Sequence, residues 1–518
     1  MSMDPRTPVI VGVGQKTVHW NPATGDAAPS PQSLRADAAR LALADSGAGA
    51  ALGGIIDRVI AVRTMLDSVP GAPQPFGRCA NPPGTVATDL GLTPRECIHS
   101  NVGGDQPQAL VNESAAAIHA GDVRAVLLTG SEATAAMKSA LKAGQALDWN
   151  HSAGEVQDDR GLGASLLSPY DVANGLGAPT QTYPAFEQAL RVRWGNSPAQ
   201  HRALMSQLWS GFSSVAAANP HAQFPVERDV EFLSTPSKDN YPVADPYLKW
   251  DVAQDAVNQG AAVVLTSVGE ADRLGIAADR RVFLHGHGHV KDKVPSERPD
   301  LSRSLATELV LRQALATSGM ADASRIGLYD LYSCFPVAVL LAAEALGLDW
   351  QRGSNLPGRA AALTLTGGLP FFGGAGNNYS MHGIAEMVSR LRGAPGTYGL
   401  VLANGGFLSK EAAGVYSTEA PAQWQPVSNA AIQAECDAQQ GPRLLSESAT
   451  ATIESWSVTW AKGEPQRGYV FARTDDGARI LARTRKDEAG KLHALADPDA
   501  VGKRVSIVHE GGVNLIAL

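Results

Sequence analysis

The sequence contains few cysteines, and their positions exclude several kinds of site. Four of its 518 residues are cysteines, at positions 79, 97, 334 and 436, and no two of them form a CxxC pair. Isolated cysteines of this kind predict neither a disulfide framework nor a zinc knuckle. They fit a reducing compartment, so we expect a cytoplasmic protein.

Long apolar runs and an excess of basic residues are also absent. The N-terminal segment, MSMDPRTPVIVGVGQ, lacks the basic stretch and long apolar core of a signal peptide. The apolar stretch 337–348 is interrupted by Glu344 and is too short to span a bilayer, so we expect no membrane span. The net charge of -8 argues against a nucleic-acid-binding surface.

The composition that is present fits a soluble globular protein with a large core. Hydrophobic residues make up 44% of the chain and charged residues 18%. The length allows two or three domains.

One pattern of elements occurs twice in the chain. Residues 7–15, TPVIVGVGQ, and 281–289, RVFLHGHGH, are apolar runs that end in alternating glycines, which predicts two buried strands. Each run precedes a predicted helix, at 33–47 and 304–319. Both helices begin with Ser-Leu and end with Ser-Gly, residues that suit a helix start and a helix stop.

The correspondence continues further along each half. Residues 99–104, HSNVGG, and 363–368, LTLTGG, each lead through a glycine-rich loop into a helix, and a strand follows. This order predicts two similar α/β halves, each with a mostly parallel sheet covered by helices.

Residues 138–250 interrupt the repeat. This stretch is long, proline-rich and irregular, with predicted helices at 183–193 and 198–219. We interpret it as a loop region lying over the first half, where functional loops often occur.

The chain ends in a region of a different kind. Five short strand-like runs follow one another within about 75 residues, and the sequence Asp-Asp-Gly at 475–477 marks a hairpin turn between two of them. They predict a small, OB-like β-barrel. The predicted domains are a first half at 1–275, a second half at 276–420, a polar linker at 421–441 and a β domain at 442–518.

Several motifs, in this order, resemble those of the thiolase superfamily. Residues 330–335, DLYSCF, match the place of the thiolase NEAF motif and of HDCF in sterol-carrier-protein thiolases. The segments 216–221 (AAANPH), 259–264 (QGAAVV) and 344–348 (EALGL) are also similar to that family. The chain thus resembles thiolase-like proteins with an added C-terminal β domain.

The resemblance implies a fold and a ligand. We expect the α/β class and the thiolase fold, with two pseudo-duplicated halves in a layered α-β-α-β-α arrangement and a C-terminal barrel. Coenzyme A or an acyl-CoA is the implied ligand, with no covalently bound cofactor. A homodimer and a monomer are both compatible with the resemblance.

The same resemblance implies that the standard catalytic residues are replaced. The nucleophilic cysteine falls on Gly103 or Gly104, and glycine cannot form a thioester. The CxG cysteine, which exchanges protons at the α-carbon of the substrate in the family, becomes Ala403. The histidine of the GHP motif becomes Asn377, which can donate to an oxyanion but cannot shuttle protons.

Four residues are the catalytic candidates that remain. Tyr332 takes the NEAF asparagine position and can donate a hydrogen bond. Cys334 matches the cysteine of HDCF and is either a reactive thiol or a buried core residue. Asn377 is an oxyanion donor, and His382, five residues further on, is a substitute acid or base. We expect the substrate-binding pocket to be lined by Gly103, Gly104, Gly376, Asn404 and Gly405.

A metal site is a weaker interpretation. His285, His287 and His289 alternate and would share one face of a strand, which can supply metal ligands. We expect no metal here, because the family has a simple strand and loop at this place.

Three functions follow as hypotheses. The first is an acyl-CoA-binding protein of the acetyl-CoA acetyltransferase type with altered chemistry. The second is a carbon–carbon lyase, a retro-aldolase acting on side-chain CoA thioesters. The third is a non-catalytic CoA-ester-binding or scaffold protein.

Overall fold

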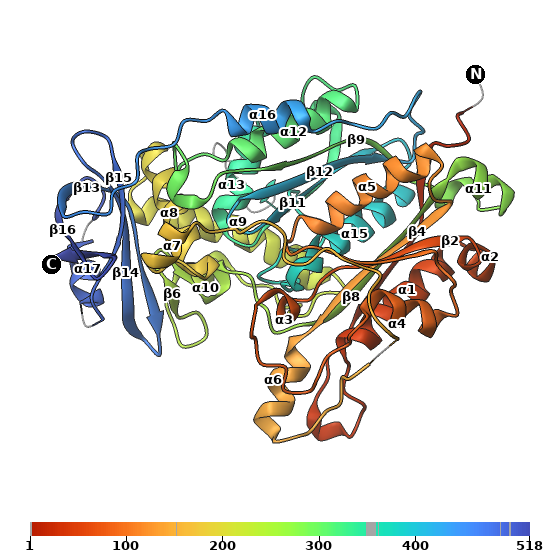
Figure 1. The fold of residues 1–518 in the computed structure, drawn as a ribbon, viewed down its shortest axis with the longest axis horizontal. Coiled ribbons are helices and arrows are strands. Elements are labelled where there is room, and N and C mark those ends of the chain that lie inside the picture. Colours follow the sequence, from red (N-terminus) through yellow and green to blue (C-terminus); the bar gives the residue numbers. More distant parts are fainter. Residues whose placement is uncertain are drawn as a thin grey trace.

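The computed structural model describes residues 3–151, 153–348, 359–360, 362–486, 488–496 and 499–517. Within these ranges the chain folds into two α/β halves, a helical region that packs beside the second half, and a small β-barrel at the C-terminal end (Figure 1).

The first half forms a six-stranded sheet. Its strands, in spatial order, are β1 (Pro8–Thr17), β8 (Asn258–Ser267), β4 (Ala125–Ala133), β2 (Ile56–Ala61), β3 (Glu96–His99) and β5 (Asp158–Asp159). Strand β8 is antiparallel to both β1 and β4, whereas β4, β2, β3 and β5 run parallel.

The second half repeats this arrangement in a four-stranded sheet. Its strands are β10 (Ile326–Leu331), β11 (Tyr398–Gly405), β12 (Lys410–Ser417) and β9 (Phe283–Lys291). Strand β12 is antiparallel to β9 and β11, as β8 is to β1 and β4. Each sheet is therefore mostly parallel, as predicted, with one reversed strand, β8 or β12. A tight connection such as that between β11 and β12 joins antiparallel neighbours.

Five layers stack across the two halves, as the thiolase fold requires. Helix α1 (Pro31–Asp45) covers the outer face of the first sheet, and α12 (Leu305–Thr317) covers that of the second. Helices α5 (Gln106–Ala120) and α15 (Tyr379–Gly393) contact strands of both sheets and form the layer between them (Figure 1). The other helices of the halves are α2 (Gly49–Gly53), α3 (Met65–Ser68), α4 (Pro82–Leu90), α6 (Thr134–Ala143), α11 (Val268–Arg273), α13 (Pro336–Ala345) and α16 (Ala430–Asp437).

The alternating glycines of β1 and β9 let the outer helices approach closely. A Cβ added at Gly12 would lie 2.0 Å from the carbonyl oxygen of Ala42 in α1. A Cβ at Gly286 would lie 2.1 Å from the carbonyl oxygen of Ala314 in α12. The repeated glycine pattern therefore reflects the same helix-on-strand contact in both halves.

The region that interrupts the repeat is mainly helical. It contains α7 (Pro169–Ala173), α8 (Pro179–Arg193), α9 (Pro198–Ala218), α10 (Val230–Ser234), β6 (Pro242–Ala244) and β7 (Tyr247–Leu248). Ser168 and Ser197 start α7 and α9 with capping boxes. Helix α8 begins four residues before the predicted start, at the proline that suits a first helical position.

The C-terminal region is a closed five-stranded barrel. Its elements are β13 (Ala449–Ala461), β14 (Glu464–Arg473), β15 (Arg479–Arg483), α17 (Ala489–Leu495), β16 (Arg504–Glu510) and β17 (Val513–Ala517). The strands follow the order β13-β14-β15-β17-β16, and β13 pairs with both β14 and β16 to close the ring. This confirms the predicted OB-like barrel.

The segment predicted as a linker contains α16, which packs on α12 and β9. The side chain of Gln433 exchanges hydrogen bonds with the backbone of Lys291, and Arg312 pairs with Glu435. The chain is therefore held to the second half on its way to the barrel.

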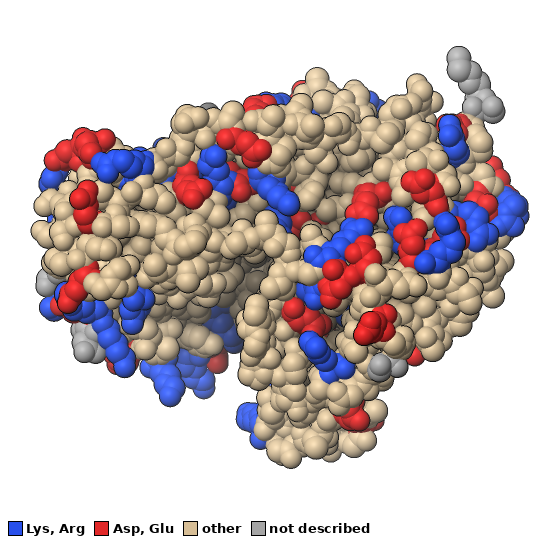
Figure 2. All heavy atoms as spheres, in the orientation of Figure 1, with Lys and Arg blue, Asp and Glu red and all other residues tan. Residues whose placement is uncertain are grey.

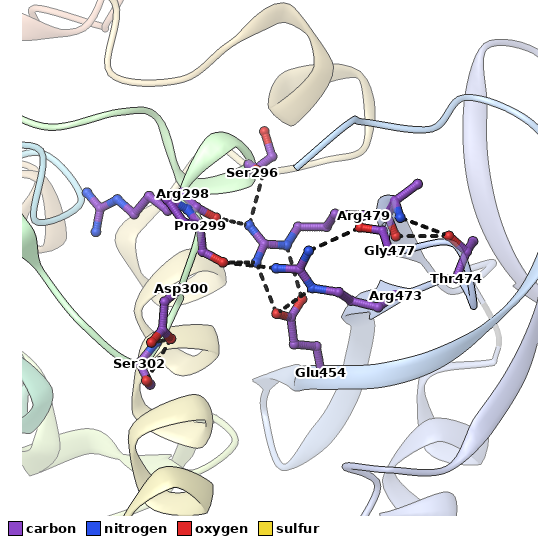
Figure 3. A network of polar contacts seen from close by, with 11 residues as sticks. Ser296, Arg298, Pro299, Asp300, Ser302, Glu454, Arg473, Thr474, Gly477 and Arg479 are labelled. Carbon is purple, nitrogen blue, oxygen red and sulfur yellow. Dashed lines mark hydrogen bonds and ion pairs between the residues drawn. The ribbon is translucent and has the colours of Figure 1, made fainter. Parts of the chain in front are cut away.

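A buried arginine joins the barrel to the second half (Figure 3). Arg479 is fully buried, and its guanidinium donates to the carbonyl oxygens of Ser296 (3.1 Å), Pro299 (3.3 Å) and Arg298. The same guanidinium pairs with Glu454 at 3.0 Å through both nitrogens that face it. Arg473 lies beside it and donates to Oε1 of Glu454 (3.0 Å) and to the carbonyl oxygen of Pro299 (2.9 Å).

The surface carries charge of both signs. Figure 2 shows Lys and Arg side chains interleaved with Asp and Glu side chains over the drawn face. No helix in the described ranges is both long and apolar enough to cross a membrane.

We predict that Arg479→Met loosens the barrel. The change leaves the carbonyl oxygens of Ser296 and Arg298 and part of Glu454 without a donor, whereas Pro299 still accepts from Arg473. Breaking a buried ion pair in this way costs about 3 kcal/mol. Urea denaturation followed by tryptophan fluorescence should show a lower midpoint. Arg504→Met removes an exposed pair with Asp475 and should leave the midpoint unchanged, and an equal loss in both variants would contradict the assignment.

Candidate functional site

The glycine loop between β3 and α5 lies at the junction of the two halves. The amide of Gly103 donates to Oδ1 of Asn377 (3.1 Å), and the carbonyl oxygen of Gly104 accepts from Oγ of Ser380 (2.8 Å). Gly103 has a φ of +144°, which residues with side chains rarely adopt. The second half thus fixes the backbone at the position that the resemblance assigns to the nucleophile.

Gly104 has no room for a side chain. A Cβ there would lie 2.2 Å from the hydroxyl oxygen of Tyr332 and 2.5 Å from the carbonyl oxygen of Asn404. Contacts below 3.0 Å essentially never occur for real Cβ atoms. The space of a nucleophilic cysteine is therefore filled by groups from the ends of β10 and β11.

Tyr332 is a buried phenol that faces this loop. Its ring packs edge-on against Tyr379, with the centroids 5.4 Å apart. Burial, with smaller contributions from Cys334 and Asp105, holds the pKa of Tyr332 well above its ordinary value. The phenol therefore stays protonated at neutral pH and is a hydrogen-bond donor instead of a base.

Cys334 lies nearby but is poorly suited to nucleophilic attack. Burial raises the pKa of its thiol to about 12, so little thiolate is present at neutral pH. Nδ2 of Asn404 donates to its sulfur at 3.7 Å and to the hydroxyl of Tyr183 at 3.0 Å. Tyr183 in turn stacks on Phe335, with ring centroids 4.2 Å apart.

Both polar atoms of the Asn377 side chain are hydrogen-bonded within the protein. Its Oδ1 accepts from Gly103, and its Nδ2 donates to the carbonyl of Arg63 and to Oγ of Ser68, both at 2.8 Å. Gly376, one residue earlier, has a φ of +55° and lies against Glu132, where a Cβ would be 2.2 Å from Oε1. Burial raises the pKa of that carboxyl to about 8.

His382 makes its contacts away from the glycine loop. It lies on α15, where its Nδ1 is 2.8 Å from Oε1 of Gln15 and its ring packs against Phe372. Burial lowers its pKa to about 3, so the imidazole is neutral at physiological pH. The structure thus brings together Gly103, Gly104, Tyr332, Cys334, Asn377, Asn404 and Gly405, but not His382.

Asp105 is a site residue that the sequence did not single out. It follows the glycine pair, is the N-cap residue of α5 and is fully buried. A Cβ at Gly103 would lie 2.0 Å from its Oδ1, and a Cβ at Gly405 would lie 2.2 Å from it. The carboxylate therefore occupies the space between the two glycine turns. The only local signal is a charged residue beside a Gly-Gly pair.

Two polar atoms of this cluster lack hydrogen-bond partners. Among the described residues, Oδ1 of Asp105 and Oδ1 of Asn404 are buried and unpartnered. Native proteins leave few such atoms unsatisfied, and each usually marks a bound water, an ion or a functional group.

The three alternating histidines of β9 have separate partners. Nε2 of His285 is 2.7 Å from the carbonyl oxygen of Glu419, His287 stacks on Trp424, and Nε2 of His289 is 3.2 Å from Oδ2 of Asp105. The described residues contain no group of three side chains arranged to hold a metal ion.

The cluster around Gly104 is closed over. Leu166, from the loop 160–167, lies against Gly406, where a Cβ would be 2.9 Å from its side chain. A cavity of about 800 Å³ lies elsewhere, between α8, α9, the β6–β7 turn and the barrel.

Two α/β halves around a shared helix layer, joined at a glycine loop, are the architecture of the thiolase superfamily. A family model described as "Thiolase-like protein type 1 additional C-terminal domain" matches residues 431–512. The crystal structure of a monomeric SCP2-thiolase-like protein type 1 from Mycobacterium smegmatis is 36% identical, with full coverage of both chains and a TM-score of 0.84. The chain belongs to this family of type 1 SCP2-thiolase-like proteins.

More distant structures share the fold alone. The acetyl-CoA acetyltransferase of Syntrophomonas wolfei is 15% identical, with a TM-score of 0.55 over 80% of this chain and 100% of its own. A structure described as "Ltp2-ChsH2(DUF35) aldolase" is 19% identical, with a TM-score of 0.55 over 80% of this chain and 98% of its own. No curated protein sequence matches the chain.

We predict that Gly104→Ala destabilises the protein, because a methyl group would press on a backbone carbonyl that cannot easily move. Overpacking of this kind costs about 1–3 kcal/mol. Gly393, the last residue of α15, has open space where its Cβ would stand, so Gly393→Ala is the matched control and should be neutral or slightly stabilising. Equal thermal midpoints for Gly104→Ala and the unaltered protein would contradict the close packing at residue 104.

Proposed function

We propose that the chain binds an acyl-CoA or a related thioester at the junction of its halves and does not form an acyl-cysteine intermediate. The observation that carries this proposal is the pair of unpartnered oxygens, on Asp105 and Asn404, beside Gly104. An unsatisfied buried polar atom costs about 1–3 kcal/mol. Its presence where thiolases hold a thioester supports a ligand that completes the hydrogen bonding.

The residues argue against thiolysis and Claisen condensation by the usual route. Residue 104 is a glycine and supplies no nucleophilic thiolate. Ala403 has no ionisable group that could exchange a proton with the substrate. Cys334 is the nearest thiol, and its raised pKa keeps it protonated. Acyl transfer through cysteine therefore has no suitable group at this junction.

Access to the proposed site requires movement of its cover. Leu166 lies against Gly406 and belongs to the loop 160–167, which is neither helix nor strand. We expect this loop to shift when a ligand enters. The relative from Mycobacterium smegmatis is described as monomeric, which supports a monomer here too.

A second candidate function is carbon–carbon bond cleavage in a β-hydroxyacyl thioester. The protonated hydroxyl of Tyr332 at the glycine loop favours it, because a neutral phenol can stabilise the oxyanion of a thioester enolate. The fold is shared with a structure described as an aldolase, and the OB-like barrel is fused to the same chain.

We predict that the protein binds CoA thioesters, measured by calorimetric titration with CoA, acetyl-CoA and acetoacetyl-CoA. Asn404→Leu keeps the size of the side chain and removes its free oxygen, so we expect about tenfold weaker binding. Asn150→Leu, at an exposed position, is the control. Undetectable affinity for all three ligands, or rapid thiolysis of acetoacetyl-CoA in the presence of CoA, would overturn the proposal.

We further predict that any cleavage of β-hydroxyacyl-CoA thioesters depends on Tyr332. Loss of one oxyanion donor lowers turnover by about a hundredfold or more, so Tyr332→Phe should lose most activity and keep its affinity. Product analysis by mass spectrometry should show a ketone or an aldehyde together with a shortened acyl-CoA. Unchanged turnover in Tyr332→Phe would remove the lyase from consideration.

A further inference from the structure

Asp105 is the best-placed proton acceptor at the junction. Its side chain is fully buried, and one of its oxygens, Oδ1, is unpartnered and lies between Gly103 and Gly405. Because neither glycine carries a side chain, this oxygen packs directly against the backbone of both turns. The chain has a carboxylate at the point where its two glycine turns meet.

The other oxygen of the same carboxylate is held in place. Oδ2 accepts from Nε2 of Gln106 at 3.0 Å and lies 3.2 Å from Nε2 of His289. His289 comes from β9 of the second half, its backbone amide donates to Asn429 (3.0 Å), and its side chain is 26% exposed. Oδ2 therefore has two partners and Oδ1 has none. Oδ1 faces the glycine loop.

Four further side chains with ionisable groups face Asp105, namely Lys410, Glu411, Tyr332 and His289. Lys410 donates to the carbonyl of Val102 at 2.6 Å, and burial lowers the pKa of its ammonium group. Burial and the charge of Asp105 hold the pKa of Glu411 well above its ordinary value, so Glu411 stays neutral. The neutral phenol of Tyr332 and the imidazole of His289 complete the set of ionisable side chains that face Asp105.

We propose that Asp105 is the base of this site and that it removes a proton from the carbon next to the carbonyl of a bound thioester. The proposal rests on the proposed function and names its proton-transferring residue. The C–H bond breaks, its proton forms an O–H bond with Oδ1, and its electron pair moves onto the carbonyl oxygen as an enolate. The reverse transfer returns a proton to the carbon, so the step needs no oxidant or other reactant. His289 is a positioning residue that orients the carboxylate.

Acetyl-CoA in D₂O is the probe for this step. Proton NMR and mass spectrometry should show the protein replacing the methyl hydrogens of acetyl-CoA with deuterium faster than buffer does. General acid–base groups contribute about 10²–10⁴-fold, so Asp105→Asn should lower the exchange rate at least a hundredfold. Asparagine has the same shape, so the affinity for acetyl-CoA should stay within a few-fold of the original.

The matched control is Asp122→Asn, which changes an exposed aspartate just beyond the other end of α5. It should exchange as fast as the unaltered protein. His289→Gln should slow exchange by about tenfold, if it removes an orienting contact worth about 1.4 kcal/mol, and should also change the pH profile of the rate. A residue with only a structural role would lower the rate and leave that profile as it was.

The outcomes separate the two proposals. If acetyl-CoA binds and the unaltered protein exchanges no faster than buffer, the role of Asp105 is wrong and the binding proposal stands. Equal exchange in Asp105→Asn and the unaltered protein also overturns the role of Asp105. Absence of binding overturns both.

Discussion

Residue 104 is the point at which the two halves touch without room for a side chain. The hydroxyl of Tyr332 and the carbonyl of Asn404 occupy the space where its Cβ would stand, and Ser380 donates to its carbonyl oxygen. Helices α5 and α15 begin beside this contact and form the layer shared by both sheets. One close contact therefore sets how the halves pack and also removes the place where a thiolase nucleophile would stand.

The barrel and the helical region, which are additions to the two thiolase halves, are both linked to the same junction. Arg298, whose carbonyl accepts from Arg479 of the barrel, donates through its own guanidinium to the carbonyls of Phe407 and Leu408, both at 2.7 Å. Tyr183 of α8 donates to Gly406 (3.1 Å) and accepts from the amide of Leu408 (3.2 Å). The turn between β11 and β12 is thus tied to both additions, which gives the barrel a structural link to the site.

The fold could be read from the sequence because its signals are local and repeated. The glycines at 12 and 286 each mark a helix resting on a strand. The barrel is signalled by five short strand-like runs with a hairpin turn between two of them. The site could be read only in part. The motifs identified the positions where the standard catalytic residues are replaced. They did not show that His382 faces away from the site: it lies two residues after Ser380, which is about 200° around the helix. The meeting of Asp105 with His289 joins residues far apart in sequence, and no local pattern reports it.

The cost of burying ionisable side chains is itself an argument for function. Asp105 and Glu411 are fully buried and Lys410 is 4% exposed, yet Lys410 donates to a backbone carbonyl and not to a carboxylate. Taking an ion out of water costs several kcal/mol, and apolar side chains of similar volume usually fill such a space at least as stably. A junction with only a packing role would have no reason to keep these groups. Their presence beside a glycine loop without a nucleophilic cysteine agrees with the proton-transferring role that we propose for Asp105.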